Sequence, residues 1–212
     1  MKITAQSVGP FQENCYLLVD ELSRRAVLID PGSEPDRLIA SVRASGATLN
    51  AIWLTHAHLD HIGAVASVKR EWDVPVYLHP AARPMYDRGG IQAAVYGVPF
   101  EQPPPPDKPL SDDDHVTVGG LSFHVLHTPG HEPGHVVFHG DGVLFSGDLL
   151  FAGSIGRTDL AMCDPQRMEE SLARVCELDD ATVVYPGHGP PTTIGAERAT
   201  NPFLNGVARV KR

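Results

Sequence analysis

Four potential metal ligands lie within six residues of one another, directly after a short apolar run. The segment Thr55–His61 reads THAHLDH and follows the apolar residues AIWL. In an extended stretch, residues two apart project to the same side, so His56 and His58 can bind one ion together. Where the chain turns into the next element, Asp60 and His61 can face a second ion. The sequence therefore predicts a metal site at the end of a strand.

Three further potential ligands occur in the same kind of setting. His131 follows TPG, Asp148 follows SG and His188 follows PG, each after an apolar run typical of a strand. Strand ends on a rigid scaffold are good places to hold a site. Imidazole and carboxylate ligands without a thiolate suit zinc, iron or manganese. We expect two divalent ions per chain, with zinc first and iron or manganese as the alternatives.

The apolar runs and the Pro and Gly punctuation predict two β-rich halves, each with helices. The expected strands are residues 3–8, 15–19, 26–29, 51–54, 74–78, 115–118, 121–127, 134–139, 142–146 and 182–185. The expected helices are residues 35–46, 63–72 and 165–178, with short helices within 81–97 and a partly helical tail after 192. Packing sheet on sheet with helices outside buries both sheet faces. We expect one domain over residues 1–212, with halves of roughly 1–102 and 107–212 joined by the proline run 103–106.

Composition narrows the possible partners and compartments. The formal net charge is −9, and such a surface repels the phosphate backbone of nucleic acids. No stretch is long and apolar enough to predict a membrane span, and the N-terminus does not read as a signal peptide. Cys15, Cys163 and Cys176 form no CxxC pair, so a reducing cytoplasm is expected. The oligomeric state stays open.

The ligand pattern resembles that of the metallo-β-lactamase superfamily, over nearly the whole chain. The resemblance implies an α/β fold, the four-layer αββα sandwich of this family. It also implies a division of the ligands between two metals, with Asp148 bridging them. One metal would take His56, His58 and His131, and the other would take Asp60, His61 and His188.

Two more residues are expected to support these ligands. Asp30, in the sequence LIDPG, resembles the family's early aspartate, and a turn aspartate before Pro-Gly is the alternative. Ligand histidines need an acceptor for their second ring nitrogen, which a carboxylate can supply. His135 is a weaker candidate for support or for substrate binding, and a packed strand histidine is the alternative.

The segment 145–159, together with residues 9–14 and 200–203, resembles the short glyoxalase II-like hydrolases. That group implies thioester hydrolysis, with S-lactoylglutathione as the model substrate. Full-length glyoxalase II carries a helical C-terminal domain that contacts glutathione, whereas only 24 residues (212 − 188) follow His188 in this chain. Arg157 is a candidate contact for an anionic substrate, and a surface salt bridge is the alternative.

The expected mechanism follows from the two ions. A metal lowers the pKa of bound water from 15.7 to about 7. A bridging hydroxide would then attack the carbonyl of a small thioester, with Asp60 and Asp148 as the catalytic carboxylates and Asp60 orienting the nucleophile. The alternatives are another ester or lactone hydrolase, and a persulfide dioxygenase. The dioxygenase resemblance lies in residues 156–159 and implies one iron on His56, His131 and Asp148.

Overall fold

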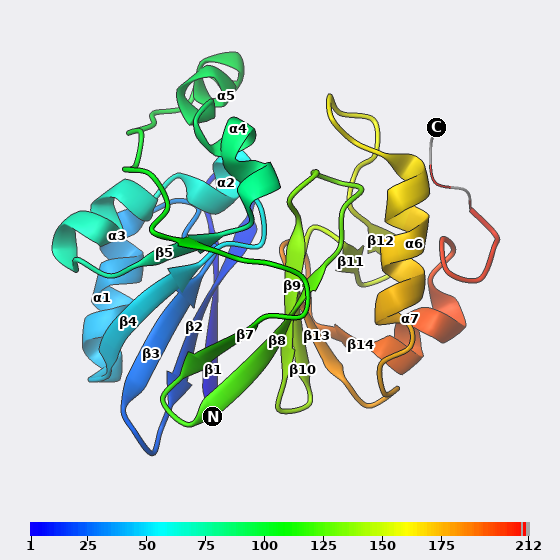
Figure 1. Cartoon of the computed structure of the whole chain (residues 1–212), viewed down its shortest axis with the longest axis horizontal. Coiled ribbons are helices and arrows are strands. Elements are labelled where there is room, and N and C mark those ends of the chain that lie inside the picture. Colours follow the sequence, from blue (N-terminus) through cyan, green and yellow to red (C-terminus); the bar gives the residue numbers. More distant parts are fainter. Residues whose placement is uncertain (209, 211–212) are drawn as a thin grey trace.

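Two mixed β-sheets pack face to face in the computed structural model, which describes residues 1–208 and 210 (Figure 1). The first sheet contains, in spatial order, β1 (Lys2–Val8), β2 (Glu13–Asp20), β3 (Arg25–Ile29), β4 (Thr48–Trp53), β5 (Val76–Leu78) and β6 (Lys108–Pro109). The second contains β14 (Thr192–Thr193), β13 (Val183–Pro186), β10 (Val143–Gly147), β9 (Val136–Gly140), β8 (Leu121–His127) and β7 (His115–Val118). A small hairpin of β11 (Leu150–Phe151) and β12 (Ser154–Ile155) lies beside the second sheet.

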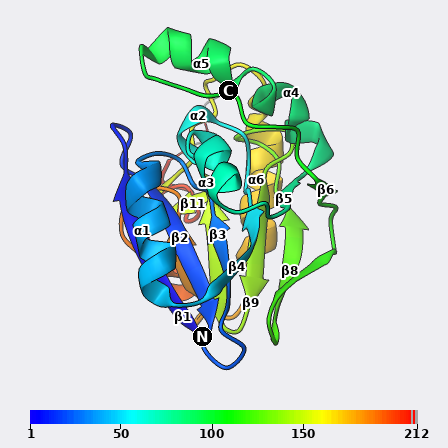
Figure 2. The same cartoon turned by 90° about the vertical axis from the view of Figure 1, so that its left-hand side faces the viewer.

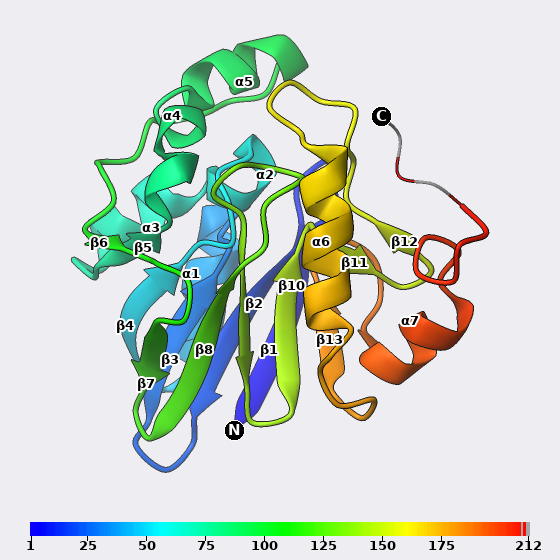
Figure 3. The ribbon, with the colours of Figure 1, turned by 45° about the vertical axis from the view of Figure 1, so that its right-hand side comes forward.

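Helices cover the outer face of each sheet, which completes the expected αββα sandwich (Figures 1 and 3). The first sheet is covered by α1 (Pro35–Ser45) and α3 (Val65–Glu71), and the second by α6 (Pro165–Val175) and α7 (Ile194–Thr200). The elements gathered at one end of the molecule are α2 (Leu59–Ile62), η1 (Pro80–Ala82), α4 (Arg83–Tyr86) and α5 (Gly89–Tyr96) (Figure 2). None of the described helices is long and apolar enough to cross a membrane.

Aromatic side chains fill the space between the sheets. The Trp53 ring lies 5.7 Å from the Phe123 ring and 5.3 Å from the Phe138 ring, measured between centroids, and all three are almost fully buried. Tyr16 of the first sheet packs against Phe145 of the second at 5.4 Å. Large aromatics dominate core energetics, so this layer fixes how the two sheets face each other. It thereby fixes where the strand ends meet.

The segment after His58 is helical, whereas the sequence predicted a turn up to His61 and a helix from Gly63. The observed α2 contains Asp60 and His61. It begins directly after His58, whose backbone is extended (φ −67°, ψ 151°). Two glycines explain its position. A Cβ on Gly32 would lie 1.5 Å from the Asp60 carbonyl oxygen, and a Cβ on Gly63 would lie 2.3 Å from the Gly32 oxygen. The loop after β3 therefore packs directly on α2.

The proline run 103–106 leads into β6, so the last strand of the first sheet comes after this run in the chain. The strand β6 pairs in parallel with β5, and the chain changes sheets only after Pro109. Tyr86 holds the run by donating a hydrogen bond to the Pro104 carbonyl oxygen at 2.8 Å.

At the end of the sheets far from α2, the carboxylate of Asp20 joins two turns. It accepts hydrogen bonds from Ser23 Oγ at 2.6 Å and from the backbone of Leu22 at 3.0 Å, both in the β2–β3 turn. It also accepts from the backbone of Gly120 at 2.9 Å, in the β7–β8 turn of the other sheet. The bond from Gly120, followed by that from Ser23, lowers the pKa of Asp20 to about 2. This carboxylate therefore links the two sheets in its ionised form.

We predict that Asp20→Asn lowers the melting temperature at neutral pH, because the neutral amide is a weaker acceptor than the carboxylate. The folded pKa is depressed, so the stabilisation is present above the unfolded pKa of about 3.9 and is lost as pH falls towards 2. The difference from the parent protein, measured by thermal melts at several pH values, should shrink over that window. Asp141→Asn at an exposed turn is the control and should melt like the parent. A pH-independent difference would contradict the assignment.

Candidate metal centre

Five strands end at the same edge of the sandwich, and a polar side chain follows each of them. Asp30 follows β3, His56 follows β4, His131 follows β8, Asp148 follows β10 and His188 follows β13. The first two come from one sheet and the last three from the other. The site therefore lies at the seam between the sheets, which we define as the edge where these strand ends meet.

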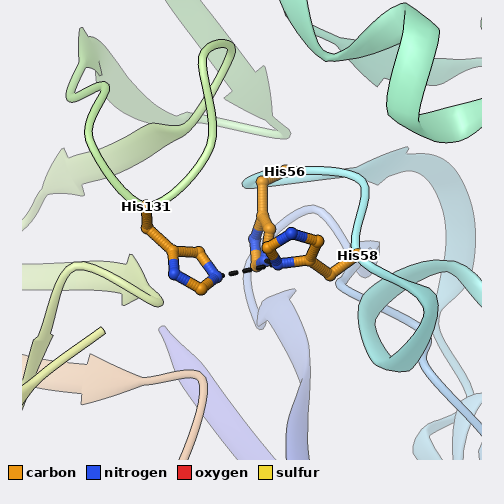
Figure 4. A group of neighbouring side chains, drawn as sticks. All are labelled: His56, His58 and His131. Atoms are coloured by element: carbon orange, nitrogen blue, oxygen red, sulfur yellow. Dashed lines mark hydrogen bonds between the residues drawn. The ribbon is translucent and has the colours of Figure 1, made fainter. Parts of the chain in front are cut away.

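Three histidine rings converge on one point from two separate loops (Figure 4). His58 Nδ1 lies 3.1 Å from His56 Nε2 and 2.8 Å from His131 Nε2. His56 and His58 lie two residues apart in an extended stretch, as the sequence predicted, and His131 comes from the opposite sheet. The arrangement offers three ring nitrogens to one cation.

A second group forms next to the first. Asp60 Oδ2 lies 3.2 Å from His188 Nε2 and 4.0 Å from His61 Nε2. Asp148 lies between the two groups. Its Oδ1 is 3.3 Å from His61 Nε2, and its Oδ2 is 3.4 Å from His131 Nε2 and 3.5 Å from His188 Nε2. All seven residues predicted as ligands therefore come together.

These spacings fit bound metal. Two ligands of a tetrahedral ion at about 2.1 Å are about 3.4 Å apart. Within each of three overlapping groups, namely His56–His58–His131, His56–His61–Asp148 and Asp60–His61–His188, the ligand atoms lie within 4.8 Å of one another. His61 Nε2 and Asp148 Oδ1 are buried and face each other at 3.3 Å, and neither makes a well-formed hydrogen bond to the described residues, although such atoms normally do. A pair of divalent cations would satisfy them.

Burial keeps the first histidine group neutral, which is the form that binds metal. Desolvation lowers the pKa of His56 well below its usual value and that of His58 to about 3. Burial likewise lowers the pKa of His131. These three side chains can accept a cation at neutral pH without first losing a proton.

The two histidines of the second group have raised pKa values, because they face carboxylates. Burial opposes a charge on His188, but its hydrogen bonds with Asp148 and Asp60 raise its pKa to about 9. Burial also opposes a charge on His61, yet the charges of Asp148 and Asp60 raise its pKa well above the usual value. The Asp148 carboxyl is buried too, but His61 holds its pKa well below the usual value. Protons on these two histidines thus balance the negative charges of Asp60 and Asp148, as bound cations would.

Asp30 supports the ligands, in keeping with its predicted role. Its carboxylate accepts hydrogen bonds from the Thr55 backbone at 2.8 Å, from Thr55 Oγ1 at 2.6 Å and from His61 Nδ1 at 3.0 Å. Thr55 Oγ1 in turn lies 3.0 Å from His56 Nδ1 and can accept its proton. The far nitrogens of two ligand histidines are thereby engaged, and their Nε2 atoms point into the site.

His135 lies below the site and contacts Asp148. Its Nε2 accepts a hydrogen bond from the Asp148 backbone at 3.0 Å, and its Nδ1 lies 2.9 Å from Thr128 Oγ1. Burial lowers the pKa of His135 well below its usual value, so the ring is neutral and Nε2 is free to accept. These contacts favour a supporting role over contact with substrate.

Arg157 contributes its backbone to the site more directly than its side chain. Its carbonyl oxygen accepts from His131 Nδ1 at 2.8 Å. Its guanidinium is 62% exposed and pairs with Asp159 at 2.8 Å, which is the salt bridge named as the alternative. The side chain still lines the cavity above the ligands.

Glu13 is a buried acid at the site that the sequence reasoning did not select. It is fully buried, its Oε1 lies 3.9 Å from His61 Nδ1, and neither carboxylate oxygen has a hydrogen-bond partner among the described residues. Burial raises its pKa well above the usual value. The available signal was an acidic residue at the start of a strand whose centre is apolar.

Asn14 and Tyr16 were also missed, and they hold the turn that carries His188. Asn14 Nδ2 donates to the carbonyl oxygens of Pro186 at 3.1 Å and Gly189 at 2.8 Å. Tyr16 Oη donates to Pro186 O at 2.6 Å. At least 170 residues separate the donors from the acceptors, so no local sequence pattern could predict these hydrogen bonds.

We predict that Asn14→Ala weakens the second ion selectively, because the His188 turn loses two hydrogen bonds. Loss of such outer contacts costs about 10- to 100-fold in metal affinity. Calorimetric zinc titration of metal-depleted protein should show one of the two binding steps weakened and the other unchanged. The control is Gln102→Ala, which removes a bond to Tyr86 O outside the site. Two unchanged steps, or equal loss at both steps, would contradict the assignment.

A cavity of about 310 Å³ opens above the ligands. It is lined by His58, Asp60, His131, Asp148, His188, Phe11, Leu59, Gln92, Tyr96, Phe151, Arg157 and Leu160. A volume of this size suits a small molecule.

The fold and the ligand set together define the class of protein. Residues 8–188 match the family described as the metallo-β-lactamase superfamily. The chain belongs to this superfamily, whose members bind divalent metal ions.

Three relatives give the comparison more detail. The chain is 37% identical to the hydroxyacylglutathione hydrolase GloC of Haemophilus influenzae, across 97% of this chain and 99% of that protein. It is 47% identical to TTHA1623, solved in a di-iron-bound form, with a TM-score of 0.88 and coverage of 95% and 100%. It is 40% identical to the BLEG-1 B3 metallo-β-lactamase, with a TM-score of 0.91 and coverage of 97% and 100%.

Proposed function

We propose that this protein is a metal-dependent hydrolase of small thioesters, with two divalent ions per chain. The observation that carries the proposal is the position of Asp148, whose two oxygens face ligand histidines of both groups. A carboxylate so placed could serve as a ligand to ions held by either group. The similarity to a hydroxyacylglutathione hydrolase supports the thioester assignment. Zinc is the first candidate metal, and the di-iron form of TTHA1623 supports iron as the alternative.

Two divalent ions in this site would lower the pKa of a bound water and polarise a substrate carbonyl. The role of the chain is to fix the geometry. Asp30 and Thr55 hold the rings of His56 and His61, and His135 fixes the backbone of Asp148. Asp60 is the carboxylate of the second group that lines the cavity, with 20% of its side chain exposed, and we assign it to orient the nucleophile and take its proton.

The cavity favours a substrate whose leaving group needs no strong acid. Apart from the five proposed ligands, the described lining residues with side-chain proton donors are Gln92, Tyr96 and Arg157. None of them is a carboxylic acid or an imidazole, the groups that most often act as general acids. Thiols have pKa values near 8.5, so a thiolate can leave without prior protonation. Alkoxides are far more basic, which places simple esters and lactones second.

Elemental analysis tests the metal assignment. We predict close to two ions per chain in protein purified without chelator. Removal of the ions should abolish thioester hydrolysis, and adding zinc, iron or manganese should restore it. One iron per chain, with the second group vacant even after metal is supplied, would contradict the proposal and favour the mononuclear dioxygenase, for which oxygen uptake is the assay.

Substitution of Asp60 tests the assignment of the nucleophile. We predict that Asp60→Asn lowers kcat/KM for thioester hydrolysis by about 10²- to 10⁴-fold, the range for loss of a general base. Asp36→Asn, at an exposed position on α1, should leave kcat/KM unchanged. Metal content is measured in parallel. A two-metal Asp60→Asn protein that retains most of its activity would refute the role given to Asp60.

A further inference from the structure

A second cavity, of about 540 Å³, adjoins the one above the ligands. Phe11, Leu59 and Asp60 line both cavities, so the two meet at these residues. Leu59 stands between the ligands His58 and Asp60 in the chain. A substrate group in the second cavity would therefore lie against Asp60, one of the proposed ligands.

The walls of this second cavity, which we call the side pocket, are mainly apolar. They include Val8, Pro10, Phe11, Pro35, Val98 and Phe100. Three acids also line it. Glu34 accepts from the Gly9 backbone at 2.8 Å and pairs with Arg37, Glu101 pairs with Arg70, and Asp60 is one of the proposed ligands. No lysine or arginine is among the described residues that line it.

The other flank of the metal cavity carries an ion pair. A third cavity, of about 390 Å³, shares Arg157 with the metal cavity and is lined by Ile155, Gly156, Arg157, Thr158, Asp159, Phe203 and Ala208. The guanidinium of Arg157 pairs with Asp159. This flank therefore combines apolar side chains with a cation, whereas no cation is among the described residues that line the side pocket.

We propose that the side pocket binds the hydrocarbon group of an uncharged thioester. This inference rests on the thioester hydrolysis proposed above and names its substrate class. A glutathione moiety carries two carboxylates, and burying a charge against apolar walls without a partner is costly. A hydrocarbon chain needs only removal from water, which this surface provides.

The size of the pocket sets the expected effect. Its volume lies within the range of about 300–1,000 Å³ that buries small ligands. One buried methylene contributes up to about fourfold in binding. Where this binding is retained in the transition state, kcat/KM should rise with chain length by up to that factor per methylene, until the pocket is full.

Two substrate series test the proposal on the metal-loaded enzyme. One carries acyl chains of increasing length on N-acetylcysteamine, an uncharged thiol, and the other carries acetyl on alkanethiols of increasing length. S-lactoylglutathione is the charged comparison. Binding of the thioether S-octyl-N-acetylcysteamine, which cannot be hydrolysed, is measured by calorimetry as a readout independent of turnover.

Ser67, on α3, lines the side pocket and is separate from the proposed ligands. Ser67→Phe fills the pocket. Val98→Trp fills it from another segment, so that misfolding of one variant does not end the test. The control is Val95→Trp, at a position on α5 that is 75% exposed.

We expect kcat/KM to rise at least about tenfold from the shortest to the six-carbon member of one series. Both filling variants should abolish this rise and the binding of the thioether, and should slow hydrolysis of the shortest substrate far less than that of the six-carbon substrate. The Val95→Trp control should keep both the rise and the binding. A flat length dependence in both series, or filling variants that leave the rise intact, would overturn the inference. Preferred hydrolysis of S-lactoylglutathione would overturn it too, yet leave the proposed thioesterase standing. If the fully loaded enzyme hydrolyses no thioester of any kind, the proposed function itself fails.

Discussion

The carboxylate of Asp30 is the contact on which the geometry of the site depends. It is buried, and it binds the backbone and hydroxyl of Thr55 as well as the ring of His61. One side chain therefore connects the end of β3, the end of β4 and the helix α2. A charge with three hydrogen bonds in a dry environment is a strong and directional constraint. The ring orientations of His56 and His61 follow from it.

A second constraint is electrostatic. Asp30, Asp60 and Asp148 lie close together at the seam with the buried Glu13, and burial alone disfavours every charge there. The raised pKa values of His61 and His188 show how the metal-free chain compensates, by holding protons. Bound cations would replace those protons, so metal binding would release them. Such a concentration of buried acidic side chains at one place, with perturbed pKa values, is typical of a functional site.

The sequence was informative wherever chemistry and local structure coincide. The THAHLDH segment and the three later ligands each follow a strand, and the structure brings all seven side chains together. The helix from Pro35 ends at Gly46, where φ is 62°, as the punctuation predicted. The αββα fold followed from the resemblance and is confirmed by the structure and the family match.

Features that depend on contacts between distant segments escaped prediction. The helix α2 begins before the predicted position because Gly32 and Gly63 allow a loop to pack against it. The hydrophobic periodicity of the sequence does not report such a contact. Asn14 serves a turn more than 160 residues away, and the orphaned acid of Glu13 has meaning only beside His61. The side pocket is likewise lined by segments far apart in the chain. Sequence periodicity reports what one element does, and these features belong to several.

The seam has a mechanical consequence. His56, His58, Asp60 and His61 come from the half of the chain that forms the first sheet, and His131, Asp148 and His188 come from the half that forms the second. An ion shared across the seam would act as a removable cross-link between the halves. A ligand that binds only the folded state stabilises it by RT ln(1 + [L]/Kd). The free energy that holds the two sheets together would then depend on the free metal concentration around the protein as well as on the aromatic layer between the sheets.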